Sequence, residues 1–284
     1  MIVRRRNRGE RVQKVDEIEH GWSEDWVLKL LFFLLLMGAV AAVTYDFQQL
    51  TNGALRLPSL PDRLRPATPI ALPEPDDQVR RYSPRSMPRY APGATVDLPG
   101  FQGDPERALA SAMTFHEGEN GSLIAIGRIE VGTFDAFERY LSVTREGENR
   151  VAFRTLILHS PGGSVQDAMS MARLVRDLDM ATLVPDNGYC VSSCPIAFSG
   201  GEERTVGSPV WFGVHQVFAR QTQTGTLQDG IESAQTISSE TQRLLSEMGV
   251  DPAAWIHAMA TPKDALYLFT QDELRRYDWI TRGE

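Results

Sequence analysis

Lysine is nearly absent from this chain of 284 residues, since Lys14, Lys29 and Lys263 are the only lysines among 29 basic residues. A buried lysine can act as a general base in catalysis. After residue 104 only Lys263 is available for that role, so a catalytic serine–lysine pair is not favoured. A G-x-x-x-x-G-K-[ST] pattern is also absent, which excludes a P-loop ATPase module from this sequence.

An excess of positive charge is lacking as well. The formal net charge is −8 and the sequence pI is near 5.3. A nucleic-acid-binding protein needs a basic stripe or patch, so we expect no nucleic-acid partner. No clustered set of metal ligands stands out along the chain, and we expect neither a metal nor another cofactor. The hydrophobic content of 42 % is ordinary for a globular protein.

The chain has only two cysteines, Cys190 and Cys194, and both lie in the stretch YCVSSCPIAFSGG over residues 189–201. In an oxidising compartment these residues can form a disulfide. The closed loop would be short, so the effect would be local rigidity more than a large gain in stability. The alternative is that both act as small buried hydrophobic side chains.

One long apolar run is present, from Trp26 to Tyr45. As a helix, its 20 residues would be about 30 Å long, which matches the hydrocarbon core of a membrane. The only charge within it, Lys29, lies near one end, where its side chain can reach the interface. A buried core helix and a cleaved signal peptide are alternatives, the latter because the small residues at 39–41 resemble a cleavage site. The length of the run favours an uncleaved anchor.

The distribution of charge around this run predicts its orientation. Six Lys or Arg residues precede position 15, whereas none lies between the run and Arg56. The positive-inside rule predicts a basic cytoplasmic N-terminus over residues 1–25, a transmembrane helix over 26–45 and an exported remainder. We therefore expect a single-pass protein of a bacterial inner membrane with a periplasmic C-terminal domain. The alternative is a protein that is secreted after signal cleavage.

A proline-rich segment follows, because ten of the 17 prolines lie between Pro58 and Pro99. Such a composition predicts an extended linker over residues 46–103, since it offers few large apolar side chains for a core. We expect one globular domain over residues 104–284, a length that suits a single core.

Hydrophobic patterns within the domain alternate between strand-like and helix-like segments. Ser164 and Asp167 have the spacing of a capping box at the start of one helix. The alternation predicts an α/β domain with a parallel sheet. The expected strands cover 122–129, 153–160, 180–185 and 210–215, and the expected helices cover 133–143, 164–179 and most of 226–248.

Three motifs together resemble the Clp protease/crotonase superfamily, specifically its Clp-type serine peptidases. The stretch LHSPGGSV carries an S-P-G-G turn at Ser160-Pro161-Gly162-Gly163 after an expected strand. In YCVSSCPIAFSGG, Ser192 is followed nine residues later by Gly201, and in FGVHQ the histidine is His215. The resemblance covers roughly residues 120–284. It implies an α/β domain with the ClpP/crotonase-like ββα superhelical fold.

The resemblance implies that Ser192 is the nucleophile at the start of a helix and that His215 is its general base. The residue after the nucleophile is often methionine in the family, but here it is Ser193, so the choice between the two serines stays open. If Ser192 is the N-cap, the backbone N–H of Ser193 is available to an oxyanion. The Gly162 and Gly163 backbone would supply a second donor, because no side chain there blocks close approach.

A third group should orient the imidazole of His215. The segment TPKDALYLFTQDEL resembles the end segment of the family, and Asp264 takes its acidic position. Asp251 and Asp272 remain alternatives. His159 lies next to the S-P-G-G turn, yet the family has no role for a residue there, so we interpret it as structural.

The favoured function is that of a membrane-anchored, periplasm-facing serine peptidase. It would hydrolyse peptide bonds of a peptide or protein substrate through a Ser-His-Asp triad and an acyl-enzyme. One alternative is a non-catalytic binding scaffold with the same fold, and another is a crotonase-like enzyme that handles acyl-CoA. The family often assembles into rings, so a homo-oligomer is expected without a defined subunit number.

Overall fold

The computed structural model describes residues 24–54, 73–82, 95–146, 152–217 and 227–281. The chain divides into two units, Met1–Arg65 and Pro66–Glu284. The basic residues at positions 1–23, on which the predicted orientation depends, lie outside the described residues, as do linker positions 55–72 and 83–94.

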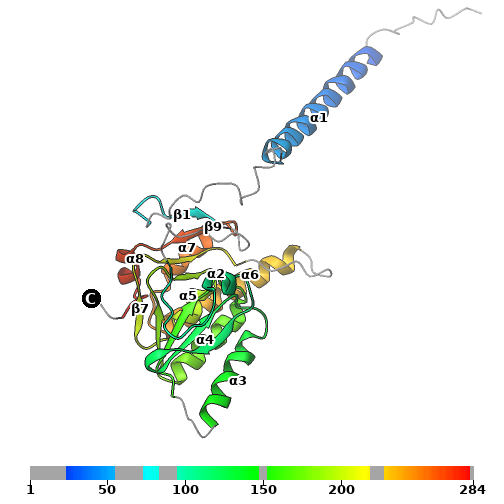
Figure 1. Cartoon of the computed structure of the whole chain (residues 1–284). Helices are drawn as coiled ribbons and strands as arrows, with labels where there is room; N and C mark the ends of the chain where they lie inside the picture. The colour runs from blue at the N-terminus through cyan, green and yellow to red at the C-terminus, as the bar shows by residue number, and fades with distance from the viewer. Residues whose placement is uncertain (1–23, 55–72, 83–94, 147–151, 218–226, 282–284) are drawn as a thin grey trace, which may run out of the picture. The chain divides into compact units, whose positions relative to one another are not determined.

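The described part of the first unit is the helix α1, Glu24–Ala54 (Figure 1). Within it, Trp26–Tyr45 has a mean hydropathy of 2.4, and none of this stretch is buried by protein. It is the only helix in the described ranges that is long and apolar enough to cross a membrane, by length and composition. An apolar surface on all sides suits a lipid environment. The span coincides with the predicted one.

The second unit contains two sheets. The strands are β1 (Val79–Arg81), β2 (Thr114–Glu117), β3 (Ser122–Ile126), β4 (Thr155–His159), β5 (Ala181–Val184), β6 (Tyr189–Val191), β7 (Arg204–Val206), β8 (Trp211–Val214) and β9 (Ala265–Leu268). One sheet has the order β2-β3-β4-β5-β7 and the other the order β1-β9-β8-β6. The predicted strands correspond to β3, β4, β5 and β8. The sequence does not predict β1, β2, β6, β7 and β9, which have three or four residues each.

The second unit also contains helices. They are α2 (Pro105–Leu109), α3 (Thr133–Glu146), α4 (Val165–Asp177), α5 (Cys194–Phe198), α6 (Leu227–Glu247), α7 (Ala254–Ala260) and α8 (Gln271–Arg276), with a short 3-10 helix, η2 (Glu119–Gly121). β3, β4, β5 and β7 pair in parallel, and the connections between them contain α3, α4 and α5. The predicted α/β architecture is confirmed.

Helix α4 forms where the sequence predicts it. The hydroxyl of Ser164 accepts a hydrogen bond from the Asp167 N–H, so Ser164 is the N-cap. The carboxylate of Asp167 also accepts hydrogen bonds from the backbone N–H groups of Gly132 and Phe134, both at 3.0 Å. One acidic side chain thus joins the starts of α3 and α4, beside the turn that precedes α4.

The domain begins earlier in the chain than the expected position 104. β1 pairs antiparallel with β9, and Leu98 is buried against Ile124, Ile126 and Ile157. The composition of the expected linker does not reveal a three-residue strand whose partner lies far away in the sequence. An edge position suits such a segment, because an edge strand needs hydrogen bonds on one side only.

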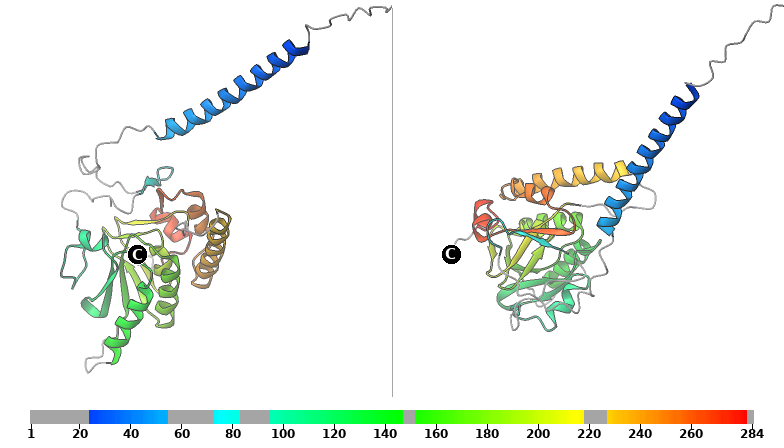
Figure 2. Two further views of the ribbon diagram at one scale, coloured as in Figure 1. Left: turned by 90° about the vertical axis from the view of Figure 1, so that its right-hand side faces the viewer. Right: turned by 90° about the horizontal axis from the view of Figure 1, so that it is seen from above.

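Helix α6 packs against α4 and α7. In both views of Figure 2 it runs along the outside of the domain, coloured gold to orange. Leu244 and Leu245 near its C-terminal end are fully buried, whereas Ile231 near its start is half exposed. The first part of α6 therefore presents an apolar side chain at the domain surface.

Candidate active site

The predicted nucleophile, base and S-P-G-G turn meet at the carboxyl ends of neighbouring strands. β6 and β8 pair in parallel with Val191 opposite Gly213, so Ser192 and His215 both follow at the same end. The Ser192 N–H donates a hydrogen bond to Gly213 O at 2.9 Å. Beyond β4, Ser160 pairs with Cys190, which brings the turn beside β6. Carboxyl ends of parallel strands are the usual location of sites in α/β folds.

Ser192 has an unusual backbone conformation. Its φ is +64°, in the left-handed region that a non-glycine residue seldom adopts. Such a conformation costs on the order of 1–3 kcal/mol and is concentrated at functional sites. Ser192 is half-buried. The expectation that Ser192 caps α5 is wrong, because the N-cap is Ser193 and Ser192 forms the sharp turn between β6 and the helix.

The side chain of Ser193 is tied to the S-P-G-G turn. Ser193 is only 2 % exposed, and its Oγ accepts a hydrogen bond from the Gly163 N–H at 2.7 Å. Among the residues that the structure describes, none accepts a hydrogen bond from the Ser193 backbone N–H. Of the two serines, Ser192 is therefore the more accessible, while Ser193 offers a backbone donor.

Glycine is required at the turn by close approach and by backbone conformation. Gly162 and Gly163 have φ values of +79° and +146°. A Cβ at Gly162 would lie 2.6 Å from Ser193 N and 2.7 Å from Ser192 Cβ, so a side chain there would displace the nucleophile segment. The Gly162 N–H donates to Ser160 Oγ at 3.1 Å. The N–H groups of both glycines therefore donate hydrogen bonds to serine hydroxyl oxygens.

The imidazole of His215 is held by the backbone that follows it. It follows β8, is 6 % exposed, and its Nδ1 lies 2.9 Å from Gln216 O. Because a carbonyl oxygen can only accept, Nδ1 carries the proton in this hydrogen bond and the lone pair is on Nε2. Burial lowers the pKa of His215 below its ordinary value, and the hydrogen bond to Gln216 opposes this effect. The imidazole is therefore neutral near pH 7.

The three candidate acids lie in different surroundings. Asp264 is exposed on the turn before β9, and its backbone carbonyl accepts a hydrogen bond from Tyr82. Asp251 accepts a hydrogen bond from the Ala253 N–H, and Asp272 forms an exposed ion pair with Arg275. The role of Asp264 as the acid of a triad stays a prediction.

Tyr82 belongs to this site although the sequence analysis did not single it out. Its hydroxyl donates a hydrogen bond to Pro161 O at 2.9 Å. Its ring lies against His215, with centroids 5.3 Å apart and planes at 36°. No sequence signal could have identified it, because it belongs to the expected linker.

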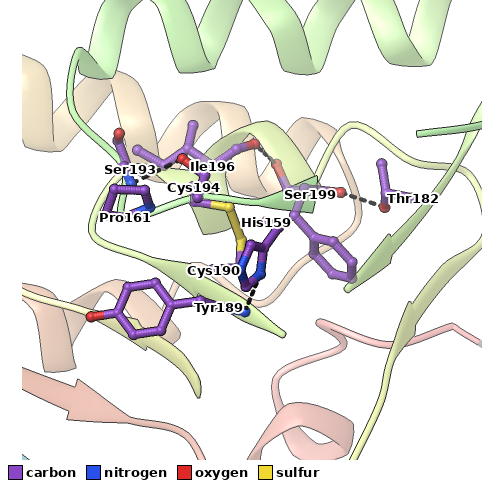
Figure 3. Close-up of a disulfide and its surroundings, with 12 residues drawn as sticks. His159, Pro161, Thr182, Tyr189, Cys190, Ser193, Cys194, Ile196 and Ser199 are labelled. Carbon is purple, nitrogen blue, oxygen red and sulfur yellow. Dashed lines mark hydrogen bonds between the residues drawn. A yellow bond between two sulfur atoms is a disulfide. The ribbon is translucent and has the colours of Figure 1, made fainter. Parts of the chain in front are cut away.

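Cys190 and Cys194 are joined by a disulfide, with their Cα atoms 5.1 Å apart (Figure 3). Both residues are fully buried. The bridge connects β6 to the first residue of α5 and spans Ser192 and Ser193. It fixes both ends of the turn that holds the left-handed Ser192.

His159 lies in the same region, as Figure 3 shows. It is 1 % exposed, and its Nδ1 accepts a hydrogen bond from the Tyr189 N–H at 3.1 Å. Burial lowers its pKa to about 3, so it stays neutral at ordinary pH. These contacts join β4 to β6 and agree with a structural role.

A groove of about 660 Å³ is lined in part by Gln216 and Val217, the two residues that follow His215. No charged side chain lines it within the described ranges, and the same ranges contain no cluster of His, Cys, Asp and Glu that could hold a metal. Its lining comes from the end of β8, from α6 and from α7, and includes Gln216, Val217, Ile231, Trp255, Ala258 and Met259.

No protein-family model and no curated protein matches the sequence. Among solved structures, the chain is similar to a variant of the 1510-N membrane-bound stomatin-specific protease, with 16 % identity, a TM-score of 0.42, and coverage of 56 % of this chain and 75 % of that one. A variant of ClpP1 from Listeria monocytogenes shares 14 % identity, with a TM-score of 0.42 and coverage of 56 % and 88 %. Another 1510-N variant, in complex with a substrate peptide, shares 16 % identity, with a TM-score of 0.41 and coverage of 54 % and 71 %. The second unit of the chain has an α/β fold with β3, β4, β5 and β7 paired in parallel.

Proposed function

We propose that the chain is a membrane-anchored, periplasm-facing serine peptidase that hydrolyses peptide bonds through an acyl-enzyme. One observation carries the proposal. Ser192 stands in a left-handed conformation at the end of β6, the Gly162 backbone packs against it, and His215 follows the neighbouring strand β8. These groups are of the types that acyl transfer uses as nucleophile, backbone donors and base, which supports the proposal.

In the proposed reaction, the Oγ of Ser192 attacks the carbonyl carbon of the scissile peptide bond. The Nε2 of His215 accepts the serine proton and then donates it to the leaving amine, which completes acylation. A water molecule, deprotonated by the same nitrogen, attacks the acyl-enzyme; the ester bond to Ser192 Oγ breaks, this oxygen takes the proton back from Nε2, and the second product leaves. The hydrogen bond to Gln216 O supports this role, because it keeps the proton of the neutral ring on Nδ1.

The tetrahedral intermediate needs donors for its oxyanion. The backbone N–H of Ser193 is the first, since it lies next to the nucleophile in the chain. We propose Gly162 or Gly163 as the second. Either N–H must exchange a serine hydroxyl, on Ser160 or Ser193, for the oxyanion. The exchange is favourable, because a hydrogen bond to a charged oxygen is stronger than one to a hydroxyl.

The groove beside Gln216 supports a preference for uncharged, partly apolar substrate segments. Its walls combine Val217, Trp255 and Met259 with neutral amides and hydroxyls. A charged substrate side chain would lose hydration there without gaining a partner of opposite charge. An apolar side chain would instead gain from the removal of its surface from water.

One alternative is a non-catalytic scaffold. It is supported by the hydrogen bonds that the Gly162 and Gly163 N–H groups already donate to serine hydroxyls. A fluorophosphonate probe separates the two functions, because it reacts only with an activated serine. The full-length chain in detergent should be labelled, and Ser192→Ala and His215→Ala should each lower labelling by on the order of 10³-fold or more. Ser193→Ala is the matched control and should still be labelled, because alanine keeps the backbone N–H.

The same assay tests the proposed acid. Asp264→Asn removes the charge and keeps the shape of the side chain. A loss of several orders of magnitude would assign Asp264 to the triad. A loss within a few-fold would show that Gln216 O orients His215 by itself. Absence of labelling in the unmodified chain would overturn the peptidase proposal, and labelling that is lost only in Ser193→Ala would exchange the roles of the serines.

A further inference from the structure

The strand β1 fixes the position of Tyr82 by main-chain contacts. Arg80 pairs with Leu266 of β9, and Arg81 pairs with Ala265. Immediately after the strand, the Tyr82 N–H donates to Asp264 O at 2.9 Å. The Tyr82 backbone is thus anchored to the sheet that also carries His215, because β9 pairs with β8.

The Tyr82 side chain points into this domain and not to solvent. It is 8 % exposed and belongs to a buried cluster that includes Leu109, Val191, Trp211 and Leu266. Val191 is the residue directly before Ser192. Tyr82 therefore belongs to the same buried cluster as the end of β6, the strand that precedes the proposed nucleophile.

The hydroxyl of Tyr82 acts on the S-P-G-G turn through a single peptide unit. It donates to Pro161 O, and that carbonyl shares a planar peptide group with the N–H of Gly162. In a trans peptide the C=O and N–H point in opposite directions. A hydrogen bond that holds Pro161 O therefore also sets the direction of the Gly162 N–H, one of the proposed oxyanion donors.

The ring of Tyr82 acts on the proposed base. The His215 imidazole lies against this ring on one side and is bonded through Nδ1 to Gln216 O. Together these contacts restrict both the tilt and the rotation of the imidazole. Burial of the imidazole against the Tyr82 ring also favours its neutral form, in agreement with the lowered pKa of His215.

We propose that Tyr82 is a positioning residue of the peptidase site, which orients His215 with its ring and the Gly162 peptide with its hydroxyl. Tyr82, which the composition of the sequence assigns to a linker, is thereby part of the active site. The inference rests on the proposed function.

The test uses the full-length chain in detergent and measures the second-order rate of labelling by a fluorophosphonate. Tyr82→Phe keeps the ring and removes the hydroxyl, so we expect a loss of about fivefold, as for one hydrogen bond. Tyr82→Leu fills the apolar cluster but lacks both the planar ring and the hydroxyl. Because small misplacements of catalytic groups are costly, we expect a loss on the order of 10²-fold. Arg81→Ala, an exposed change on the same strand, is the matched control.

A second readout does not depend on activity. The chain has five histidines, so selective labelling of histidine gives a simple imidazole NMR spectrum in which His215→Ala assigns one signal. That signal should move in Tyr82→Leu, because the aromatic ring current is lost, and should stay in place in Arg81→Ala. Melting temperatures show whether each variant is folded, and Tyr82→Phe, the mildest change, keeps the test valid if Tyr82→Leu does not fold.

The possible results separate the two proposals. If the unmodified chain is not labelled, the peptidase function fails, while the NMR comparison still tests the contact between Tyr82 and His215. If the unmodified chain is labelled and folded Tyr82→Leu reacts at the same rate, the positioning role is wrong. A loss in Arg81→Ala equal to that in Tyr82→Leu also contradicts it, because the effect would then belong to the strand and not to the tyrosine.

Discussion

The two adjacent serines show how local geometry distinguishes residues of the same type. Ser192 takes the left-handed conformation and remains half-buried, whereas Ser193 caps α5 and its hydroxyl binds the turn at Gly163. The spacing from Gly201 favours Ser192, and the structure adds a physical difference between the two. The immediate neighbours of His215 likewise determine both its tautomer and its charge.

The lowered pKa of His215 leads to a prediction about pH. Only the neutral imidazole can accept a proton, and burial makes the charged form less stable than in a free histidine. The rate of labelling should therefore stay constant as the pH falls from 8 toward the ordinary histidine value of about 6.5, and should decline only below it. A profile measured between pH 4.5 and 8 checks this. An apparent pKa of 7 or above would contradict it.

At the scale of elements, the site depends on how β4, β6 and β8 end. Their parallel arrangement brings three turns to one edge, and each turn carries one part of the proposed chemistry. The disulfide strengthens the middle turn, because Cys190 closes β6 and Cys194 opens α5. Rigid strand ends with a short connection can hold an unfavourable conformation that a longer loop would relax.

Removal of the disulfide tests whether it holds the turn around Ser192. We expect Cys190→Ala combined with Cys194→Ala to lower fluorophosphonate labelling on the order of tenfold, because the turn around Ser192 can then relax. The stability lost should be modest, about 2 kcal/mol, since the closed loop is short. Labelling rates and urea unfolding measure the two effects.

The chain has no other cysteines, so a reducing agent acts only on this pair and should reproduce the effect in the unmodified protein. Alkylation of both thiols without prior reduction would show that the bond is not present in the isolated protein. Unchanged labelling after complete reduction would show that the turn holds its conformation without the bridge.

At the scale of the whole molecule, the chain combines one apolar helix with one α/β unit. Parts of the segment between them belong to the α/β unit, because β1 completes a sheet and Leu98 joins a buried cluster. If Tyr82 has the proposed role, a fragment that starts at residue 104 would lack part of the site. Activity should therefore be measured on the full-length chain.

Orientation in the membrane is a prediction that concerns the whole chain. A reporter that is active only outside the cytoplasm, fused after Glu284, should be active, because the basic residues before Trp26 favour a cytoplasmic N-terminus. A matched fusion placed before Trp26 should be inactive. The opposite pattern would reverse the orientation, and the intact mass of the mature protein shows whether residues 1–45 are retained.

The sequence by itself determined features that depend on neighbours along the chain. The apolar span of 26–45, the strands β3, β4, β5 and β8, and the cap of α4 at Ser164 all follow from composition or periodicity within short windows. The motifs also identified the S-P-G-G turn, Ser192 and His215 as candidates, because their side chains and spacing carry the resemblance.

Only the tertiary structure decided which groups meet. The contacts of Tyr82 with Pro161 and His215, and that of Ser193 Oγ with the Gly163 N–H, join segments that lie far apart in the sequence. No local pattern predicts such pairs, since they form when strand pairing and burial bring distant backbone together. The position of β1 follows the same principle, because its partner β9 lies near the other end of the chain and the pairing satisfies backbone hydrogen bonds that carry no side-chain signature.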